Sequence, residues 1–323
     1  MPVTCRAAIV QHPPVFLNLD ASLARAEQLI AEAAAGGAQL IVFPETWLPG
    51  YPVWLDEAPG AGLWGEPGAE RMYQALAENS LELPGAALAR LLDAARTSGA
   101  WLVMGAHERL GGTLYNSMVF LAPDGETWSV HRKLIPTYTE RLLWGQGDGS
   151  TLTTVGTPFG ALGGLICWEH WMPLARAAMH GMHETIHVAQ WPTARDLHQI
   201  ASRHYAFEGQ CFVLAAGTVL TRRDVFDGLR SIGLDAPEVR RLMDPMRGDD
   251  GTRMLRGGSA IIAPDTRYLA GPTFDEAGIL YADLDMALVT RGHLVMDSAG
   301  HYARPDVFRL EVDTRVRRDV TFG

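Results

Sequence analysis

Cysteine and basic residues are both scarce in this sequence. Its 323 residues include three cysteines, an odd number and far too few for a disulfide framework, so we expect a reducing compartment. Lysine and arginine number 27 against 37 aspartate and glutamate, which gives a formal net charge of −10. Phosphate binding needs clustered basic side chains, so this balance argues against a general affinity for nucleic acid or an anionic membrane. A small molecule or a protein is the expected partner.

Long apolar runs are also missing. The longest charge-free stretch, Gly149–Trp168, has enough residues to span a bilayer, but its repeated Thr and Gly and the central Pro158 predict two short strands and a turn. The apolar part of the N-terminal segment, Ala7–Val10, is too short for a signal peptide. We therefore expect a cytoplasmic protein without a membrane segment.

The composition is that of a globular α/β protein, with 47% apolar and 20% charged residues. Short apolar or alternating runs predict strands at Arg6–Gln11, Leu40–Pro44, Trp101–Ala106, Tyr115–Ala122, Thr127–Leu134, Leu152–Thr157, Leu162–Cys167, Thr185–Gln190, Cys211–Gly217, Ser259–Ala263 and Ile279–Asp283. Helical spacing predicts helices at Asp20–Ala35, Pro84–Thr97, Pro173–His180 and Thr193–Glu208. Because each half repeats a strand–helix series, we expect two mixed sheets packed face to face with helices outside, a four-layer αββα sandwich.

The repeat of this series in the two halves favours one domain over residues 1–313 instead of two domains. Residues 221–257 break the pattern, because they are rich in Arg and Asp and show only one possible short helix, at Pro237–Met243. A segment of this length is an active-site cover, an oligomer contact or a disordered insertion, and the sequence does not choose among them. Residues 314–323 are expected to form a solvated tail.

The sharpest local signal surrounds Cys167, in the run Gly163–His170. An apolar, glycine-rich strand ends at this cysteine, and a helical pattern with Pro173 in its first turn follows. Helix N-termini favour thiolate and oxyanions, so Cys167 is a candidate nucleophile, although a buried structural cysteine is an equal alternative. Cys5 and Cys211 lie in apolar strand patterns and are expected to be core thiols.

A nucleophilic thiol needs a base and a group that stabilises developing charge. Glu45 follows Pro44 at the end of an apolar strand, where burial would raise the pKa of its carboxyl and suit it to act as a base; a capping or salt-bridged glutamate is the alternative. Lys133 ends another strand pattern, and Glu140 follows a turn that contains proline. An isolated lysine at such a position is usually a solvated edge residue.

Taken together, these segments resemble the nitrilase superfamily of carbon–nitrogen hydrolases, which uses a Glu-Lys-Cys triad. Phe43-Pro44-Glu45, Arg132-Lys133 and Gly163–Glu169 match its three motifs in the same order. The segments His131–Gly149, Cys167–Arg176 and Asp297–Phe308 resemble the signatures of the nitrile-hydrolysing branch. The resemblance covers the chain from Arg6 to about Val312 and implies the αββα fold.

The resemblance also implies a reaction. Glu45 would take the proton of Cys167, whose thiolate attacks the nitrile carbon to form a thioimidate. Lys133 and the backbone N–H of Trp168 would stabilise the charge on nitrogen, and Glu140 would position Lys133 or the substrate amine. Water then releases ammonia, and a second water hydrolyses the acyl thioester to the carboxylic acid. Because thiol, carboxylate and ammonium serve every step, neither a metal nor an organic cofactor is expected.

Aromatic residues crowd the triad segments, which predicts an apolar pocket for a hydrophobic nitrile. The expected lining, chosen by distance in sequence from the triad, is Tyr51, Trp54, Thr137, Trp168, Trp171 and Trp191.

A second motif suggests different chemistry. The run from His183 to His187 matches H-E-x-x-H, a zinc-binding pattern that works only on a helix. Here Gly181 precedes it and Ile186–Trp191 alternates like a strand, so we expect the two histidines to lie on different elements.

Three alternatives to a nitrilase remain open at this point: an amide-cleaving relative with the same triad, a catalytically silent interaction protein on this scaffold, and a zinc peptidase. The family resemblance further implies a homodimer. Dimers of the family extend into spirals, partly through C-terminal segments longer than the tail of this chain.

Overall fold

The computed structural model describes residues 3–317 and contains two β-sheets. The first sheet has six strands in the order β13-β1-β2-β3-β4-β5. Its strands are β1 (Thr4–Gln11), β2 (Leu40–Val42), β3 (Trp101–Leu110), β4 (Thr113–Leu121), β5 (Trp128–Arg132) and β13 (Gly278–Asp285). β1, β2 and β3 run parallel, and the other neighbours pair antiparallel.

The second sheet has seven strands, six of them in the order β10-β11-β9-β8-β7-β6, with β12 paired to β11. Its strands are β6 (Val155–Thr157), β7 (Gly160–Ile166), β8 (Glu184–Gln190), β9 (Phe212–Ala216), β10 (Val219–Thr221), β11 (Arg253–Ile262) and β12 (Tyr268–Phe274). β7, β8 and β9 are parallel. Each sheet therefore has a parallel centre and antiparallel edges, as the repeated strand–helix series predicts.

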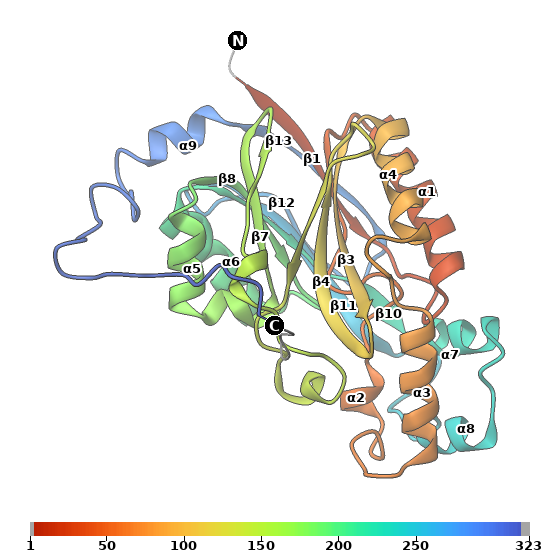
Figure 1. The fold of residues 1–323 in the computed structure, drawn as a ribbon. Coiled ribbons are helices and arrows are strands. Elements are labelled where there is room, and N and C mark those ends of the chain that lie inside the picture. The colour runs from red at the N-terminus through yellow and green to blue at the C-terminus, as the bar shows by residue number, and fades with distance from the viewer. Residues whose placement is uncertain (1–2, 318–323) are drawn as a thin grey trace.

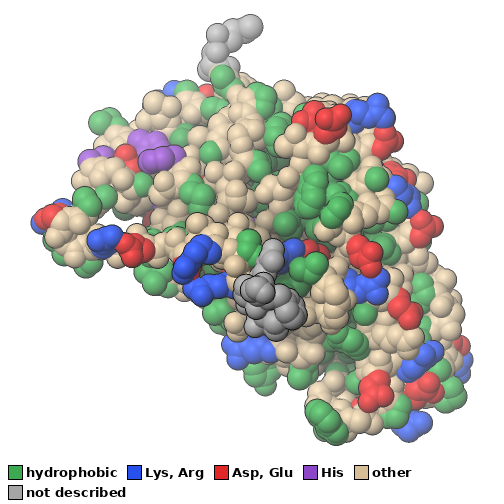
Figure 2. Space-filling view, in the orientation of Figure 1, with side chains coloured by type: hydrophobic (Ala, Val, Ile, Leu, Met, Phe, Trp, Pro, Cys, Tyr) green, Lys and Arg blue, Asp and Glu red, His purple; other side chains and the backbone are tan. Residues whose placement is uncertain are grey.

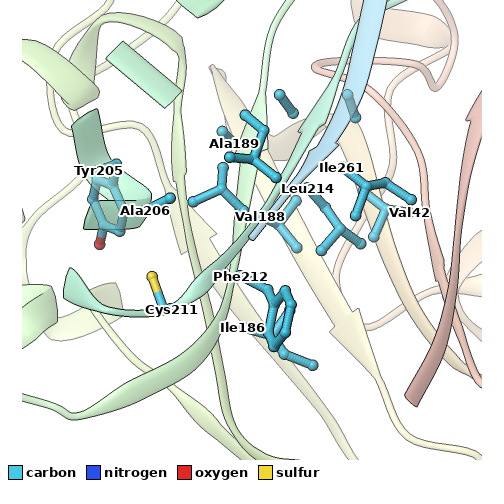
Figure 3. Packing of buried hydrophobic residues seen from close by; sticks show 14 of the residues in the cluster. Val42, Ile186, Val188, Ala189, Tyr205, Ala206, Cys211, Phe212, Leu214 and Ile261 are labelled. Carbon is cyan, nitrogen blue, oxygen red and sulfur yellow. The ribbon is translucent and has the colours of Figure 1, made fainter. Parts of the chain in front are cut away.

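Helices cover the outer face of each sheet. Figure 1 shows α1 (Leu19–Ala35) and α4 (Ala86–Ser98) beside the first sheet, and α5 (Pro173–His180) and α6 (Asp196–Gly209) beside the second. The core between the sheets holds apolar side chains from both, including Val42 of β2, Leu214 of β9 and Ile261 of β11 (Figure 3). The predicted four-layer αββα sandwich is confirmed.

The first helix shows how the sequence specifies an outer layer. The side-chain oxygen of Asn18 accepts a hydrogen bond from the Ala21 N–H and caps α1. Leu23, Ala26 and Ile30 recur at helical spacing and are buried against the first sheet, so the apolar face of the helix lies inward.

Residues 221–257 are folded and form part of a third apolar cluster. They contain α7 (Arg222–Ser231) and α8 (Pro237–Met243), which pack with α2 (Trp54–Glu57) and α3 (Pro67–Glu78). A Cβ on Gly68 of α3 would lie 2.5 Å from the carbonyl oxygen of Glu238 in α8, so the glycine permits close contact of the two helices. α8 matches the predicted helix, whereas α7 was not predicted because only Val225 and Leu229 among its larger apolar residues are buried.

The chain after α9 (Ala287–Gly292) has neither helix nor strand up to residue 317. Figure 1 shows this segment leaving the body near α9 and returning past α5, and Figure 2 shows an opening between part of the segment and the body. Where it returns, the Arg317 N–H donates to Asp148 Oδ2 at 2.7 Å. Residues 314–317 of the predicted tail are exposed, and residues 318–323 lie outside the described residues. No helix within residues 3–317 is long and apolar enough to cross a membrane.

Candidate active site

Three strands end at one buried cluster of polar side chains. Glu45 lies just beyond β2 and Lys133 just beyond β5 of the first sheet, and Cys167 follows β7 of the second. A Cβ on Gly105 of β3 would lie 2.0 Å from the Pro44 carbonyl oxygen, so this glycine lets the turn before Glu45 pack against β3. The cluster thus forms where the carboxyl ends of strands from both sheets meet.

The Lys133 ammonium connects two carboxylates. Its Nζ donates to Glu45 Oε1 at 2.8 Å and to Glu140 Oε2 at 2.7 Å, and all three side chains are buried. Asn116 Nδ2 of β4 donates to Glu45 Oε1 as well, at 2.7 Å. The Cys167 sulfur and one oxygen from each carboxylate lie within 4.8 Å of one another. The three residues predicted from the motifs, Glu45, Lys133 and Cys167, are therefore brought together with the separately predicted Glu140, and Asn116 is an unpredicted fifth member.

Cys167 adopts an unusual backbone conformation. Its φ of +53° is left-handed, and it begins the 3₁₀ turn η3 (Cys167–Trp171), which precedes α5. Non-glycine residues rarely occupy this region, so the surroundings must hold the residue there. The predicted helix Pro173–His180 is confirmed as α5, and the short turn η3, which was not predicted, lies between the thiol and this helix.

Burial and neighbouring charges set the protonation of the cluster. Burial raises the pKa of the Glu45 carboxyl, and the opposing Lys133 charge offsets this only in part. Burial and the Glu45 carboxylate raise the pKa of the Cys167 thiol well above its usual value. Burial would lower the pKa of Lys133, but the two carboxylates raise it instead, so the side chain stays an ammonium ion. The resting site therefore holds a thiol that needs a base.

One oxygen of Glu45 is available as that base. Its Oε2 atom is buried and has no hydrogen-bond partner among the described residues. The three donor atoms of Glu45, Glu140 and Cys167 are spaced closely enough for a metal ion. The Lys133 ammonium already binds both carboxylates, however, so the positive charge of the site is supplied by the chain itself.

Glu140 is held on both of its oxygens. The Tyr51 hydroxyl donates to Oε1 at 2.9 Å, and the Thr137 N–H donates to Oε2 at 2.6 Å. These bonds fix the carboxylate over Lys133 at the turn η1 (Tyr138–Leu142).

Glu169, to which the sequence assigned no role, joins the two strand ends of the site. Its carboxylate accepts from the N–H of Ile166 beside Cys167 and from the N–H of Leu134 beside Lys133, each at 2.7 Å. His131 Nε2 lies 2.9 Å from Oε2. Burial would raise the pKa of Glu169, yet His131 and the two N–H groups hold it below the usual value. A glutamate two residues after the thiol, within the matched motif Gly163–Glu169, was the available sequence signal.

A cavity of about 270 Å³ opens onto Cys167. Tyr51, Thr137 and Trp168 line it, as predicted from the sequence. Glu140 and Cys167 of the predicted cluster border it as well. The lining residues that were not predicted come from α2 and the residue before it, the turn η1, the segment between β8 and α6, α6 itself and residues 221–257: Val53, Asp56, Glu57, Tyr138, Thr139, Pro192, Thr193, Arg195, His198, Met254 and Leu255. Charged side chains thus share the wall with aromatic ones.

The remaining predicted lining residues lie outside this wall in the described part of the chain. Trp54 is buried edge-on against Phe16, with ring centroids 5.9 Å apart. Trp191 is buried against the His170 ring at 4.7 Å. Trp171 borders a neighbouring hollow, which it shares with Thr137 and Trp168. Distance in sequence could not separate a core tryptophan from one at a cavity wall.

The residues of the H-E-x-x-H run lie on different elements, as expected. His183 is exposed in the turn before β8, and Glu184 and His187 are buried within that strand. Cys5 and Cys211 lie in the core between the layers, and burial raises the pKa of Cys5 to about 12.

The chain is similar to known proteins over nearly its whole length. The family model described as Carbon-nitrogen hydrolase matches residues 6–293. Nitrilase 1 of Arabidopsis thaliana is 39% identical over 321 residues, which cover 99% of this chain and 90% of the relative. An aliphatic nitrilase of Sinorhizobium fredii is 41% identical, with 95% of each chain covered.

The fold is also found among solved structures. A carbon-nitrogen hydrolase from Helicobacter pylori superposes with a TM-score of 0.70 at 19% identity and covers 94% of this chain and 97% of its own. Since a family model and full-length relatives agree, the chain belongs to the carbon–nitrogen hydrolase family, within its nitrilase branch.

Proposed function

We propose that this chain hydrolyses an organic nitrile to the carboxylic acid and ammonia. One observation carries the proposal: Glu45, Lys133, Glu140 and Cys167 converge in one buried cluster, in a chain whose full-length relatives at about 40% identity include nitrilases. The chain is thus a hydrolase of carbon–nitrogen bonds other than peptide bonds.

The cluster suits covalent catalysis. Glu45 takes the Cys167 proton as sulfur attacks the nitrile carbon, the C≡N bond becomes the C=N bond of a thioimidate, and the proton passes to its nitrogen, which leaves Glu45 ionised again. Lys133 and the Trp168 N–H stabilise the charge that develops on nitrogen. Water activated by Glu45 adds to the thioimidate carbon and ammonia leaves, which gives an acyl thioester. A second water hydrolyses this ester and returns the thiol.

The cavity residues Tyr51, Thr137 and Trp168 would contact the substrate directly. Trp171 and Trp191, which pack on each other at 5.6 Å, would support the wall from behind, and Trp54 would support it from the side of α2. Since thiol, carboxylate and ammonium supply every proton and charge, the proposal includes no cofactor.

An amide hydrolase would use the same four residues, so the test compares matched substrates. We expect purified protein to release ammonia from members of a panel of aliphatic, aromatic and arylacetonitriles at higher kcat/KM than from the corresponding amides. Mass spectrometry should show an acyl or thioimidate adduct on Cys167, and Cys167→Ala should abolish both the adduct and the ammonia.

The outcomes separate the alternatives. Faster turnover of the amides would assign the chain to the amide-cleaving alternative. Absence of ammonia from every nitrile and amide, with no adduct, would favour an interaction protein on this scaffold.

We further propose a cytoplasmic homodimer that binds neither nucleic acid nor membrane. Support for the dimer comes from apolar side chains exposed on the outer helices, namely Leu174 on α5 and Leu197, Ile200 and Phe207 on α6. Larger spiral assemblies would build on such a dimer. Sedimentation velocity tests the proposal, because a mass of one chain would contradict it.

A further inference from the structure

Four side chains behind Cys167 form a polar chain that the proposed reaction does not use. His170 lies on η3, Glu184 and His187 on β8, and Tyr205 on α6. All four are buried, with at most 3% of any of them exposed. Figure 3 shows Tyr205 at the edge of the central core, on the side of the second sheet. Polar groups this deep need hydrogen-bond partners, because water does not reach them.

The four side chains bind one another in sequence. The Tyr205 hydroxyl donates to Glu184 Oε2 at 2.5 Å, and Glu184 Oε1 lies 2.8 Å from His187 Nδ1. His187 Nε2 lies 3.0 Å from His170 Nε2, and His170 Nδ1 lies 2.7 Å from the carbonyl oxygen of Cys167. The chain therefore runs from α6 through β8 to the backbone of the candidate nucleophile.

The positions of the protons follow from the last contact. A carbonyl oxygen can only accept, so His170 Nδ1 must carry a proton. If His170 is neutral, its Nε2 is bare and His187 Nε2 donates to it. The Nδ1 of a neutral His187 is then bare, so Glu184 Oε1 must carry a proton and donate. Every contact is satisfied without any charged side chain only when Glu184 is a carboxylic acid, because an ionised Glu184 would need a second proton on His187 or His170.

The environment favours this neutral form. Burial raises the pKa of Glu184 to about 7, although the Tyr205 hydroxyl bond opposes the shift. Burial, reinforced by the neighbouring His187, lowers the pKa of His170 to about 3. Burial also lowers the pKa of His187 well below its usual value. The two imidazoles therefore resist the second proton that an ionised Glu184 would require.

Among the other ionisable groups around the hydrogen-bonded chain, His180 acts on Glu184, and its charge opposes the rise in the Glu184 pKa without cancelling it. His180 of α5 lies against the Tyr205 ring and pairs with Glu208 of α6, which also binds Arg176. Arg176 Nη1 donates to the His170 carbonyl oxygen, and Cys211 is a buried thiol whose pKa burial raises well above the usual value. Glu169, which precedes His170 in the sequence, pairs with His131.

The packing makes room for this arrangement. A Cβ on Gly163 of β7 would lie 2.0 Å from Glu184 Oε1, so only glycine at this position leaves space for the carboxyl. Tyr205 stacks on His187 with ring centroids 3.7 Å apart. At the other end, the bonded carbonyl belongs to a residue held at a φ of +53°, which needs such support.

We propose that His170, His187, Glu184 and Tyr205 are positioning residues, which hold Cys167 in its left-handed conformation through a neutral hydrogen-bonded chain that needs a proton on Glu184. The inference rests on the proposed function in taking Cys167 as the nucleophile. It gives Glu184 and His187 of the H-E-x-x-H run a role that involves no metal.

A consequence for pH follows. When Glu184 loses its proton, its oxygen must accept from His187 Nδ1, and His170 Nε2 must then donate to His187. A neutral His170 is left with a bare Nδ1 facing the Cys167 carbonyl oxygen, where two acceptors repel each other. Positioning of the thiol is therefore lost as pH rises through the Glu184 pKa.

Glu184→Gln and Glu184→Ala test the proposal. The amide of Gln reproduces the protonated acid, because its nitrogen donates to His187 and its oxygen accepts from Tyr205, and it cannot ionise. We expect Glu184→Gln to keep kcat within about threefold and to lose the alkaline decline of the unmodified chain. Glu184→Ala should lower kcat at least about tenfold, the equivalent of one lost hydrogen bond, with KM nearly unchanged.

The second readout needs no nitrile. The rate at which iodoacetamide alkylates Cys167, followed by mass spectrometry from pH 6 to 9, should rank the variants as kcat does. The unmodified protein and Glu184→Gln should react faster than Glu184→Ala. Alkylation that follows this order in a protein without nitrile turnover would refute the proposed function and retain this inference. Cys211→Ala, a buried substitution in the same core, controls for lost stability and should leave the alkylation profile unchanged.

Two results would overturn the proposal. One is a folded Glu184→Ala protein with the kcat and alkylation rate of the unmodified chain. The other is a Glu184→Gln protein as impaired as Glu184→Ala. If the hydrogen-bonded chain needed the ionised carboxylate, Gln and Ala would both remove it and would lower kcat equally.

Discussion

Two polar clusters meet at Cys167, and they solve the cost of burial in opposite ways. In the front cluster, which consists of Glu45, Lys133 and Glu140, the two carboxylates bind the Lys133 ammonium at 2.8 and 2.7 Å. Behind the thiol, the chain from Tyr205 to His170 satisfies each contact without net charge when Glu184 is protonated. A buried charge needs an opposite charge, whereas a neutral chain needs only the correct tautomers.

The two clusters therefore have different roles: the charged one takes part in the reaction, and the neutral one holds the backbone of Cys167 in place. Charges in front of the thiol can take up its proton and stabilise charge on the substrate nitrogen. A charge behind the thiol would change the pKa of Cys167 without touching the substrate. The neutral chain fixes the backbone while leaving the electrostatics of the site to Glu45, Lys133 and Glu140.

Removing the single cation in front should have the largest effect. In Lys133→Met, two buried carboxylates lose their ammonium, and the nitrogen of the substrate loses a positive partner. We expect kcat/KM to fall about 10³-fold and the free energy of unfolding at pH 8 to fall by about 3 kcal/mol. The stability should recover towards pH 5, because protonation removes the repulsion. Ammonia release and urea unfolding at both pH values measure this.

Arg132→Met is the matched control for that substitution. Arg132 binds Glu108 at 2.6 Å, and that buried carboxylate is not part of the group formed by Glu45, Glu140 and Cys167. We expect a comparable loss of stability with kcat/KM within about threefold of the unmodified chain. A Lys133→Met protein with kcat/KM within tenfold of the unmodified value would contradict the charged role of the front cluster.

The decrease of kcat/KM at low pH should reveal the protonation of Glu45 in the front cluster. Glu45 must be ionised to accept the Cys167 proton, and burial raises the pKa of its carboxyl above the ordinary 4.5. We expect kcat/KM to fall about tenfold per pH unit below that raised pKa, with the cluster titrating as a unit.

The contribution of Glu45 to the free energy of unfolding should instead increase as pH falls over the same range. A raised carboxyl pKa favours folding fully below pH 4.5, and this contribution is lost as pH rises through the pKa of the folded state. Urea unfolding between pH 4.5 and 8, with Glu45→Gln as the variant that lacks this titration, measures it. Activity that persists unchanged at pH 5 would contradict Glu45 as the base.

The four-layer fold could be predicted from the repeated strand–helix series, and the four clustered residues from the resemblance of three ordered motifs to a known family. From the residues alone, a structural Cys167 and a solvated Lys133 remained open, because a strand end is a local signal that says little about which ends meet. One further signal was overlooked: Lys133 is the only lysine in the sequence, so the remaining basic residues are all arginine. A lone lysine beside a strand end stands out against that background.

The cavity wall and the chain behind the thiol could not be predicted, because both depend on which elements meet in space. Trp54 and Tyr51 lie three residues apart, yet one packs on Phe16 and the other binds Glu140. Glu184 and His187 form a zinc-like run in the sequence, and only their position on β8 shows that they bind Tyr205 and His170 instead.

The smallest expected effect comes from removing the hydroxyl group of either of two tyrosines that each donate to a glutamate. Tyr51 donates to Glu140 in front, at 2.9 Å, and Tyr205 donates to Glu184 behind, at 2.5 Å. A bond to an ionised acceptor contributes about 1.5–3 kcal/mol, and one between neutral groups about 0.5–1.5 kcal/mol. Tyr51→Phe should therefore lower the free energy of unfolding more than Tyr205→Phe, although the bond it removes is the longer one. Urea unfolding at pH 6, where Glu184 is protonated, gives both values. A larger loss for Tyr205→Phe would mean that Glu184 is ionised and that both clusters carry charge.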